Sequence, residues 1–115
     1  MSNPNSLAQR IRDGLLFDAY GSLLTEKQRS ACEMVLIQDL SLAEAAQNLC
    51  VSRQGVHDLL TRSREHMESI EGSLGILEKD ALLEEIGELT DRNKERLPKD
   101  FYEKLKELLK GNIDV

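Results

Sequence analysis

Apolar residues recur at helical spacing along nearly the whole chain, and the strict alternation typical of strands occurs nowhere. Near the start an apolar residue returns every four positions, at Leu7, Ile11 and Leu15, which predicts a helix capped by Asn5 or Ser6 and running to about Leu24. A second helix is predicted from Thr25 to Gln38, because T-E-K-Q forms a capping box in which glutamine replaces the usual glutamate. The pattern predicts an all-α protein of about six helices.

The stretch from Ser41 to Met67 predicts two short helices joined by a tight turn, which is a helix-turn-helix. Ser41 opens a capping box with Glu44 three positions on, and Ser52 starts the second helix. Val51 and Val56 are spaced as a hydrophobic staple across that second start. Two small residues are expected where the helices cross, Ala45 and Ala46, and one buried face is expected from Leu42, Leu49, Val51, Val56 and Leu59.

The C-terminal third predicts a helical hairpin. The preceding helix continues toward Ile70, where Gly72 and Gly75 offer stops. An apolar stripe predicts a helix over 75–93, and Leu97-Pro98 breaks the chain because proline disfavours the α conformation in the residue before it. Asp100 is expected to cap a last helix over 100–110, closed by Gly111. We therefore expect two regions, 1–70 and 71–115, within one compact domain.

Composition bounds the class of protein. The chain has 115 residues, 40% of them apolar and 3% aromatic, so the core must be aliphatic and no platform for stacking single-stranded bases is expected. A core this small favours oligomerisation, and we expect a homodimer. No apolar run could cross a bilayer and the first ten residues lack the apolar core of a signal peptide, so a cytoplasmic protein without membrane insertion is predicted.

Catalytic and metal-binding signatures are absent from the sequence. Cys32, Cys50, His57 and His66 match no zinc-finger spacing, so no metal site is predicted and the cysteines are expected to be small buried residues. The sequence contains no phosphate-binding glycine loop, nucleophile elbow or zinc-protease motif. We expect a protein that is not an enzyme and has no cofactor.

Charge works against strong binding to nucleic acid. The chain carries 15 basic and 21 acidic residues, a net charge of −6. Only the second helix of the motif is slightly positive, with three arginines against Asp58 and Glu65. Because neutralised phosphates supply most non-specific affinity, any binding to DNA should be weak or assisted by a dimer or a partner.

The candidate nucleic-acid-binding residues lie on that second helix. Arg53 and Gln54 stand in its first turn, where this motif meets base edges, and they suit guanine and adenine respectively. Two further arginines are expected to contact phosphates, which position the protein without specifying sequence. The alternative is that these side chains are simply solvated. The full candidate set is Arg53, Gln54, His57, Thr61, Arg62 and Arg64.

Two resemblances support this interpretation. L-T-E-K-Q at 24–28, S-L-A-E-A-A at 41–46 and V-S-R-Q at 51–54 resemble the fourth region of bacterial sigma factors. Over nearly the whole chain, F-D-A-Y-G-S-L-L-T-E-K-Q, D-L-S-L-A-E-A-A, V-S-R-Q-G-V-H-D and L-P-K-D-F resemble the YlxM family of small bacterial proteins. This resemblance implies a sigma region-four-like helix-turn-helix bundle, a regulatory role in the signal recognition particle pathway, and no catalytic residues.

The motif departs from the usual pattern at two positions. Cys50 stands where a glycine is usual, which puts a side chain at an expected left-handed position. Gly55 stands where an alanine is expected and loosens the helix that would enter a groove. Two functions therefore stay open: a regulator that binds duplex DNA through the second helix, and an interaction module for the particle's protein or RNA without sequence-specific DNA binding.

Overall fold

The computed structural model describes residues 6–113, and every regular element within that range is helical. Contacts divide the chain into two compact units, 1–75 and 76–115, which are described separately. No helix in the described range is both long and apolar enough to cross a bilayer. The elements are α1 (Leu7–Tyr20), η1 (Gly21–Leu23), α2 (Glu26–Cys32), η2 (Glu33–Ile37), α3 (Leu42–Leu49), α4 (Arg53–Leu74), α5 (Ile76–Arg92), η3 (Lys94–Arg96) and α6 (Lys99–Ile113).

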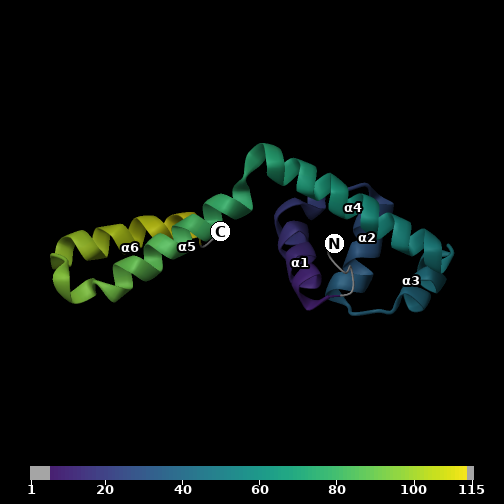
Figure 1. Ribbon diagram of the computed structural model, residues 1–115, viewed down its shortest axis with the longest axis horizontal. Helices are drawn as coiled ribbons and strands as arrows, with labels where there is room; N and C mark the ends of the chain where they lie inside the picture. Colours follow the sequence, from purple (N-terminus) through teal and green to yellow (C-terminus); the bar gives the residue numbers. More distant parts are fainter. Residues whose placement is uncertain (1–5, 114–115) are drawn as a thin grey trace. The chain divides into compact units, whose positions relative to one another are not determined.

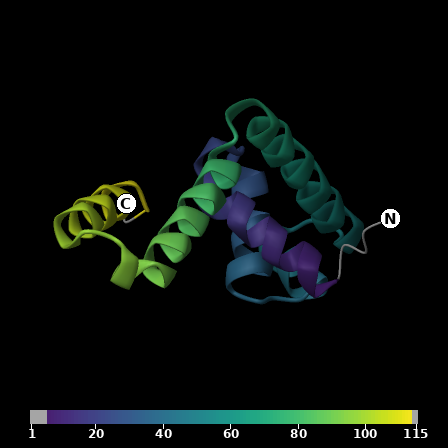
Figure 2. The same ribbon diagram turned by 60° about the vertical axis from the view of Figure 1, so that its left-hand side comes forward.

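The first unit is organised around α4, a helix of 22 residues. Helices α1, α2 and α3 all contact it, and Figure 1 and Figure 2 show α4 running across them. The buried apolar residues of this unit are aliphatic, small or methionine, apart from one tyrosine, as the low aromatic content predicts. They comprise Leu16, Tyr20, Leu24, Ala31, Cys32, Ala45, Ala46, Val56 and Met67.

The predicted helix starts of this unit are confirmed by their hydrogen bonds. Ser41 Oγ accepts from the Glu44 backbone N–H at 3.1 Å, and the Glu44 carboxylate accepts from the Ser41 backbone N–H at 2.9 Å. The backbone bond holds the pKa of Glu44 below its usual value. Side-chain caps also occur at Ser6, Thr25 and Ser52. The cap at Thr25 is reciprocal, as at Ser41, whereas at Ser6 and Ser52 only the serine side chain accepts a bond. These caps satisfy N–H groups that the first turn of a helix leaves open.

Two helix boundaries in this unit differ from the prediction. The first helix ends at Tyr20 rather than near Leu24, because the chain tightens into the 3₁₀ turn η1. The helix predicted to end near Ile70 continues to Leu74, and only Gly75 stops it, with a left-handed φ of 64°. Gly72 lies inside the helix because its backbone stays right-handed, so this glycine is not a stop.

The second predicted helix is helical over its length but changes type. It is α-helical through Cys32 and becomes the π-helical turn η2 over Glu33–Ile37. Asp39 follows with a φ of 59°, and the side chain of Arg10 bonds both the Val35 carbonyl and the Asp39 carboxylate. Sequence periodicity does not distinguish a π turn from an α turn over so short a stretch.

The apolar stripe that predicts α1 is not its inner face. Leu7, Ile11 and Leu15 are 75%, 56% and 49% exposed. The buried residues of α1 are Asp13, Leu16 and Tyr20. A buried carboxylate thus stands among the core positions of this helix, and a row of large aliphatic side chains faces outward.

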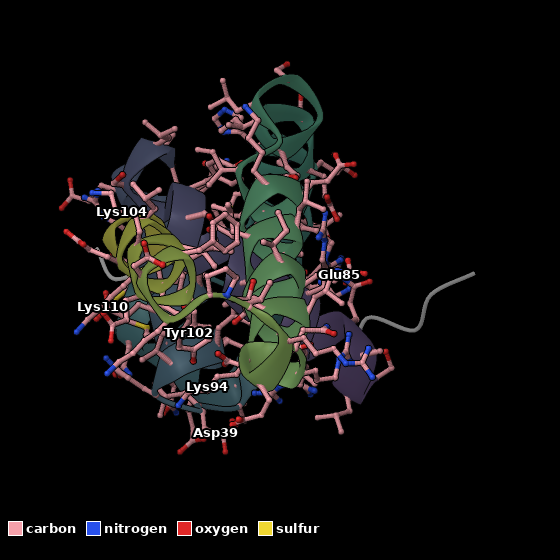
Figure 3. All side chains as sticks on the ribbon, turned by 90° about the vertical axis from the view of Figure 1, so that its left-hand side faces the viewer. Asp39, Glu85, Lys94, Tyr102, Lys104 and Lys110 are labelled. Atoms are coloured by element: carbon pink, nitrogen blue, oxygen red, sulfur yellow. The ribbon has the colours of Figure 1, made fainter. Side chains whose placement is uncertain are left out.

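The second unit is a hairpin of two helices, α5 and α6, which lie side by side in Figure 1. Gly87, Thr90 and Leu109 are its buried residues within the described part. Polar contacts close the turn end of the hairpin: Asp91 accepts hydrogen bonds from the Tyr102 hydroxyl at 2.8 Å and from Lys106 Nζ at 3.1 Å. Lys94 Nζ lies 5.3 Å from the centre of the Tyr102 ring, a cation–π contact (Figure 3).

Most of the large apolar residues of the hairpin stay outside its small interior. Leu82, Ile86 and Leu89 lie on one face of α5, since they are spaced by four and three residues, and all are exposed. On α6, Phe101 and Leu108 are exposed at a spacing of seven. Two details of α6 differ from the prediction: it begins at Lys99, so Asp100 lies in its first turn, and it passes Gly111 to end at Ile113. Whether the two units form one domain stays a prediction.

Candidate nucleic-acid interface

Helices α3 and α4 form the predicted helix-turn-helix. Ala45, Ala46 and Val56 make a buried cluster at the crossing, where the small alanine side chains let the two helices approach. Leu42, Leu49 and Val51 pack against this cluster as predicted. The next turn of α4 contributes Leu60 to the same cluster. The crossing fixes the direction in which the first half of α4 leaves the unit.

The turn between the two helices has the left-handed residue that the sequence predicts. Cys50 has φ 56° and ψ 41°, and its backbone N–H bonds the carbonyls of Ala46 and Gln47. Its side chain is exposed, so the prediction of a buried residue is wrong for Cys50, whereas the thiol of Cys32 is buried as predicted and its pKa is raised by desolvation. The turn thus forms despite a side chain at a position where glycine has no steric penalty.

The glycine in the first turn of α4 has a local cause. A Cβ placed on Gly55 would stand 3.2 Å from Ser52 Oγ and 3.4 Å from Val51 Cβ. Ser52 Oγ accepts from the Gly55 N–H at 2.9 Å, so the capping serine and the staple valine leave little room for a side chain at position 55. Gly55 therefore lets the turn close tightly over the start of α4.

The exposed residues of this first half include Arg53, Gln54 and Arg62. Gln54 is not free of local contacts, because its amide donates to the Asp58 carboxylate at 2.9 Å. His57 Nδ1 stands 3.9 Å from the same carboxylate, close enough to pair with it when the imidazole is protonated. Asp58 thus bonds Gln54 and lies near His57, two of the side chains that the sequence assigns to nucleic-acid binding.

Arg64 is placed differently from the prediction of a phosphate contact. Its Nε lies 2.9 Å and 3.1 Å from the two carboxylate oxygens of Asp13, and its Nη2 lies 2.8 Å from one of them. The side chains are 23% and 6% exposed, and the hydrogen bond to Asp13 raises the pKa of Arg64. Because this guanidinium neutralises a buried carboxylate of α1, we leave Arg64 out of the proposed interface.

Two further polar contacts join α1 to the second half of α4. Arg12 binds the Glu68 carboxylate through Nε at 3.1 Å and Nη2 at 2.7 Å, and the Tyr20 hydroxyl donates to Glu71. Sequence reasoning missed these positioning contacts. The available signal was Asp13, an acidic residue three positions before the core residue Leu16, which marks a buried charge in need of a partner.

A pocket of about 220 Å³ lies on one flank of α4, within the first unit. It is lined by three of the predicted site residues, His57, Thr61 and Arg64, together with residues of α1, η2 and the start of α3. The six predicted residues therefore do not form one surface. Arg53, Gln54 and Arg62 lie outside the pocket lining.

Within residues 6–113, no group of three or more histidine, cysteine, aspartate or glutamate side chains is arranged to hold a metal ion. Two ion pairs of the first unit, Arg12–Glu68 and Arg64–Asp13, instead join α1 to α4. The chemistry on display at α4 is that of hydrogen bonding and charge pairing.

The fold and this site define a helix-turn-helix protein with an added N-terminal helix and a C-terminal hairpin. Residues 7–108 match the family described as "Putative helix-turn-helix protein, YlxM / p13 like", UPF0122. The chain belongs to this UPF0122 family, which confirms the YlxM resemblance.

Relatives share most of their length with this chain. A UPF0122 protein of Clostridium botulinum is 39% identical over 101 residues, 88% of this chain and 83% of the relative. One of Staphylococcus epidermidis is 36% identical over 106 residues, which cover 90% of this chain and 96% of the relative. One of Clostridium kluyveri is 42% identical over 79 residues, 69% and 71% of the two chains.

Proposed function

We propose that this cytoplasmic protein is a regulator that binds duplex DNA weakly through the first half of α4. The observation that carries the proposal is the Ser52-capped start of α4, which exposes Arg53 and Gln54 in its first turn and Arg62 further along. In this motif the second helix enters the major groove with its N-terminal residues toward the bases. His57 and Thr61 lie one and two turns further along the flank of the same helix.

Weak affinity follows from the same surface. Asp58 and Glu65 are exposed on α4 beside the arginines, so the helix carries almost no net charge toward phosphates. Gln54 must also give up its bond to Asp58 before it can read a base. A dimer raises the affinity of such an element by placing two copies on two half-sites.

The test is fluorescence polarisation of the full chain with duplexes selected from a random pool, compared with unselected duplex over a range of salt. Arg53→Ala should remove most of the preference for the selected duplex, about 1–3 kcal/mol, because a bidentate base contact is lost. Arg62→Ala should weaken both duplexes alike and lower the salt slope by about 1. Asp58→Asn should strengthen both, since it removes a repulsive charge and replaces a charge-assisted bond to Gln54 with a weaker neutral one.

Arg92→Ala is the matched control, because it removes the same charge from the hairpin. It should leave both affinities unchanged. If wild type binds no duplex at low salt, or if Arg92→Ala weakens binding as much as Arg62→Ala, the DNA-binding proposal is wrong.

A second candidate function is an interaction module without sequence-specific DNA binding. Its support is the exposed apolar set on the hairpin: Leu82, Ile86, Leu89, Phe101 and Leu108.

We propose that this set forms a two-fold homodimer interface, and the family resemblance makes the signal recognition particle's protein and RNA the first other partners to test. Light scattering should give twice the chain mass of 13.0 kDa. A Leu82→Asp/Leu89→Asp variant should be monomeric, and a wild type that stays monomeric at high micromolar concentration rules the dimer out.

A further inference from the structure

The pocket beside α4 has walls of two kinds. One part is aliphatic and the other contains paired charges. The aliphatic side chains are Val35, Leu36, Leu40, Leu42, Leu60 and Met67. At about 220 Å³ the pocket is larger than the cavity of about 150 Å³ that takes benzene and smaller than the roughly 300 Å³ at which drug-sized sites begin.

The cations that line the pocket are already neutralised within the fold. Arg64 pairs with Asp13 at 2.8 Å, and Arg10 pairs with Asp39 at 2.9 Å. A charged ligand would have to displace one of these carboxylates or lose its hydration without gaining a partner. The lining therefore suits a small uncharged molecule with an aliphatic body and one polar group within reach of a residue such as Thr61.

The backbone that frames the pocket is irregular. Val35 and Leu36 belong to the π-helical turn η2, and the left-handed Asp39 lies two residues after its end. Single π turns and left-handed non-glycine residues both carry an energetic cost and occur often at functional sites. Arg10 holds this frame by bonding the Val35 carbonyl and the Asp39 carboxylate together.

We propose that this pocket binds a small, uncharged, mainly aliphatic molecule. Because His57, Leu60, Thr61 and Arg64 make one wall, the bound molecule contacts α4 itself. Occupancy then changes the DNA affinity of α4, and this second step rests on the proposed function, whereas binding to the pocket does not.

The test of binding is a titration of the full chain, with methyl groups isotope-labelled for NMR, using cyclohexanol as the probe. Methyl signals of Leu36, Leu42 and Leu60 should shift with half-saturation near about 1 mM, as expected for so few heavy atoms. Cyclohexylamine and cyclohexanecarboxylate share the ring but carry a charge, and each should bind at least about tenfold more weakly.

Two adjacent residues of η2 give matched variants. Leu36→Trp fills the pocket and should abolish the shifts, whereas Ile37 is exposed outside the lining, so Ile37→Trp should keep them. Circular dichroism and melting establish that both variants fold, and Thr61→Leu fills the pocket from α4 if Leu36→Trp does not. Shifts that persist in the filled variants, that fail to saturate, or that appear equally with the charged probes overturn the proposal.

Duplex polarisation with and without cyclohexanol tests the second step. We expect at least a twofold change in affinity in wild type and Ile37→Trp, and none in Leu36→Trp. Saturating methyl shifts with an unchanged duplex affinity overturn the coupling alone. Absence of duplex binding overturns the proposed function and leaves the titration as the test of the pocket.

Discussion

The two units of this protein bury very different amounts of apolar surface. Among the described residues, nine of the ten buried apolar side chains belong to the first unit and only Leu109 belongs to the hairpin. The first unit adds a buried ion pair and two more polar contacts between α1 and α4. The hairpin instead exposes six large apolar side chains within the described residues and relies on surface bonds around Asp91. Within one short chain, one unit holds a helix in place through buried contacts and the other leaves most of its large apolar side chains outside its interior.

The largest expected effect comes from breaking the buried pair of the first unit. Arg64→Ala leaves the Asp13 carboxylate buried without its partner, and we expect it to lower the free energy of unfolding by about 3 kcal/mol. Urea unfolding measures the change. Arg10→Ala removes solvent-exposed bonds to Asp39 and to the Val35 carbonyl and should cost about 1 kcal/mol or less. An Arg64→Ala protein of normal stability but weakened DNA binding would return Arg64 to the interface.

A smaller loss is expected in the hairpin. Leu109→Ala should lower the local stability of α5 and α6 by about 2 kcal/mol, because it empties the one large apolar position that is buried among the described residues of that unit. Amide hydrogen exchange at low protein concentration separates the units: protection should fall in α5 and α6 and remain in α4. Leu82→Ala at an exposed site is the control. Equal loss of protection in both units would show that they unfold together and would erase the contrast.

The turn of the motif should be improved by the residue usual at its position. Cys50→Gly removes the left-handed penalty, and we expect a gain of about 1 kcal/mol in the free energy of unfolding of the first unit. Urea melts decide the sign. The exposed thiol of Cys50 gives little packing to lose, so a destabilised variant would mean that the greater freedom of glycine in the unfolded chain outweighs the relieved penalty.

The smallest effect is the pH dependence of the hairpin. Hydrogen bonds from Tyr102 and Lys106 lower the pKa of Asp91, so its contribution is complete above the usual 3.8 and fades as the pH falls below that value. The bond to Asp91 raises the pKa of Tyr102, so its contribution is complete below 10.0 and is lost as the pH rises through the raised value. Amide exchange of α5 and α6 should show a loss of protection at acidic pH and another at alkaline pH. Tyr102→Phe should remove the alkaline loss.

Local features of the fold could be predicted from sequence. The caps at Ser41 and Ser52 and the left-handed Cys50 depend on residues within four positions of each other, so their patterns are visible in the chain. The crossing of α3 and α4 was also predictable, because Ala45 and Ala46 are the small residues it requires. The exposed positions of Arg53, Gln54 and Arg62 follow from that crossing.

Contacts between distant segments could not be predicted in the same way. Asp13 and Arg64 are 51 residues apart, and nothing in the local pattern separates a buried arginine from one that waits for a phosphate. The stripe of α1 predicts the helix but not its buried side, since periodicity shows that a face exists but not what covers it. The π turn η2 and the pocket beside it depend on packing that spacing does not record.

Helix α4 is long and unbroken, so a small rotation at one end moves the other end by a larger distance. The polar contacts to α1 hold the second half of the helix at Arg64, Glu68 and Glu71, while Arg53 stands at the opposite end, near the crossing with α3. Fifteen residues separate Glu68 from Arg53, an arm of about 22 Å at 1.5 Å per residue. A rotation of α4 by about 5° at Glu68 moves the end at Arg53 by about 2 Å, which is most of a hydrogen-bond length. A small change in the contacts between α1 and α4 would therefore be magnified into a larger displacement of Arg53.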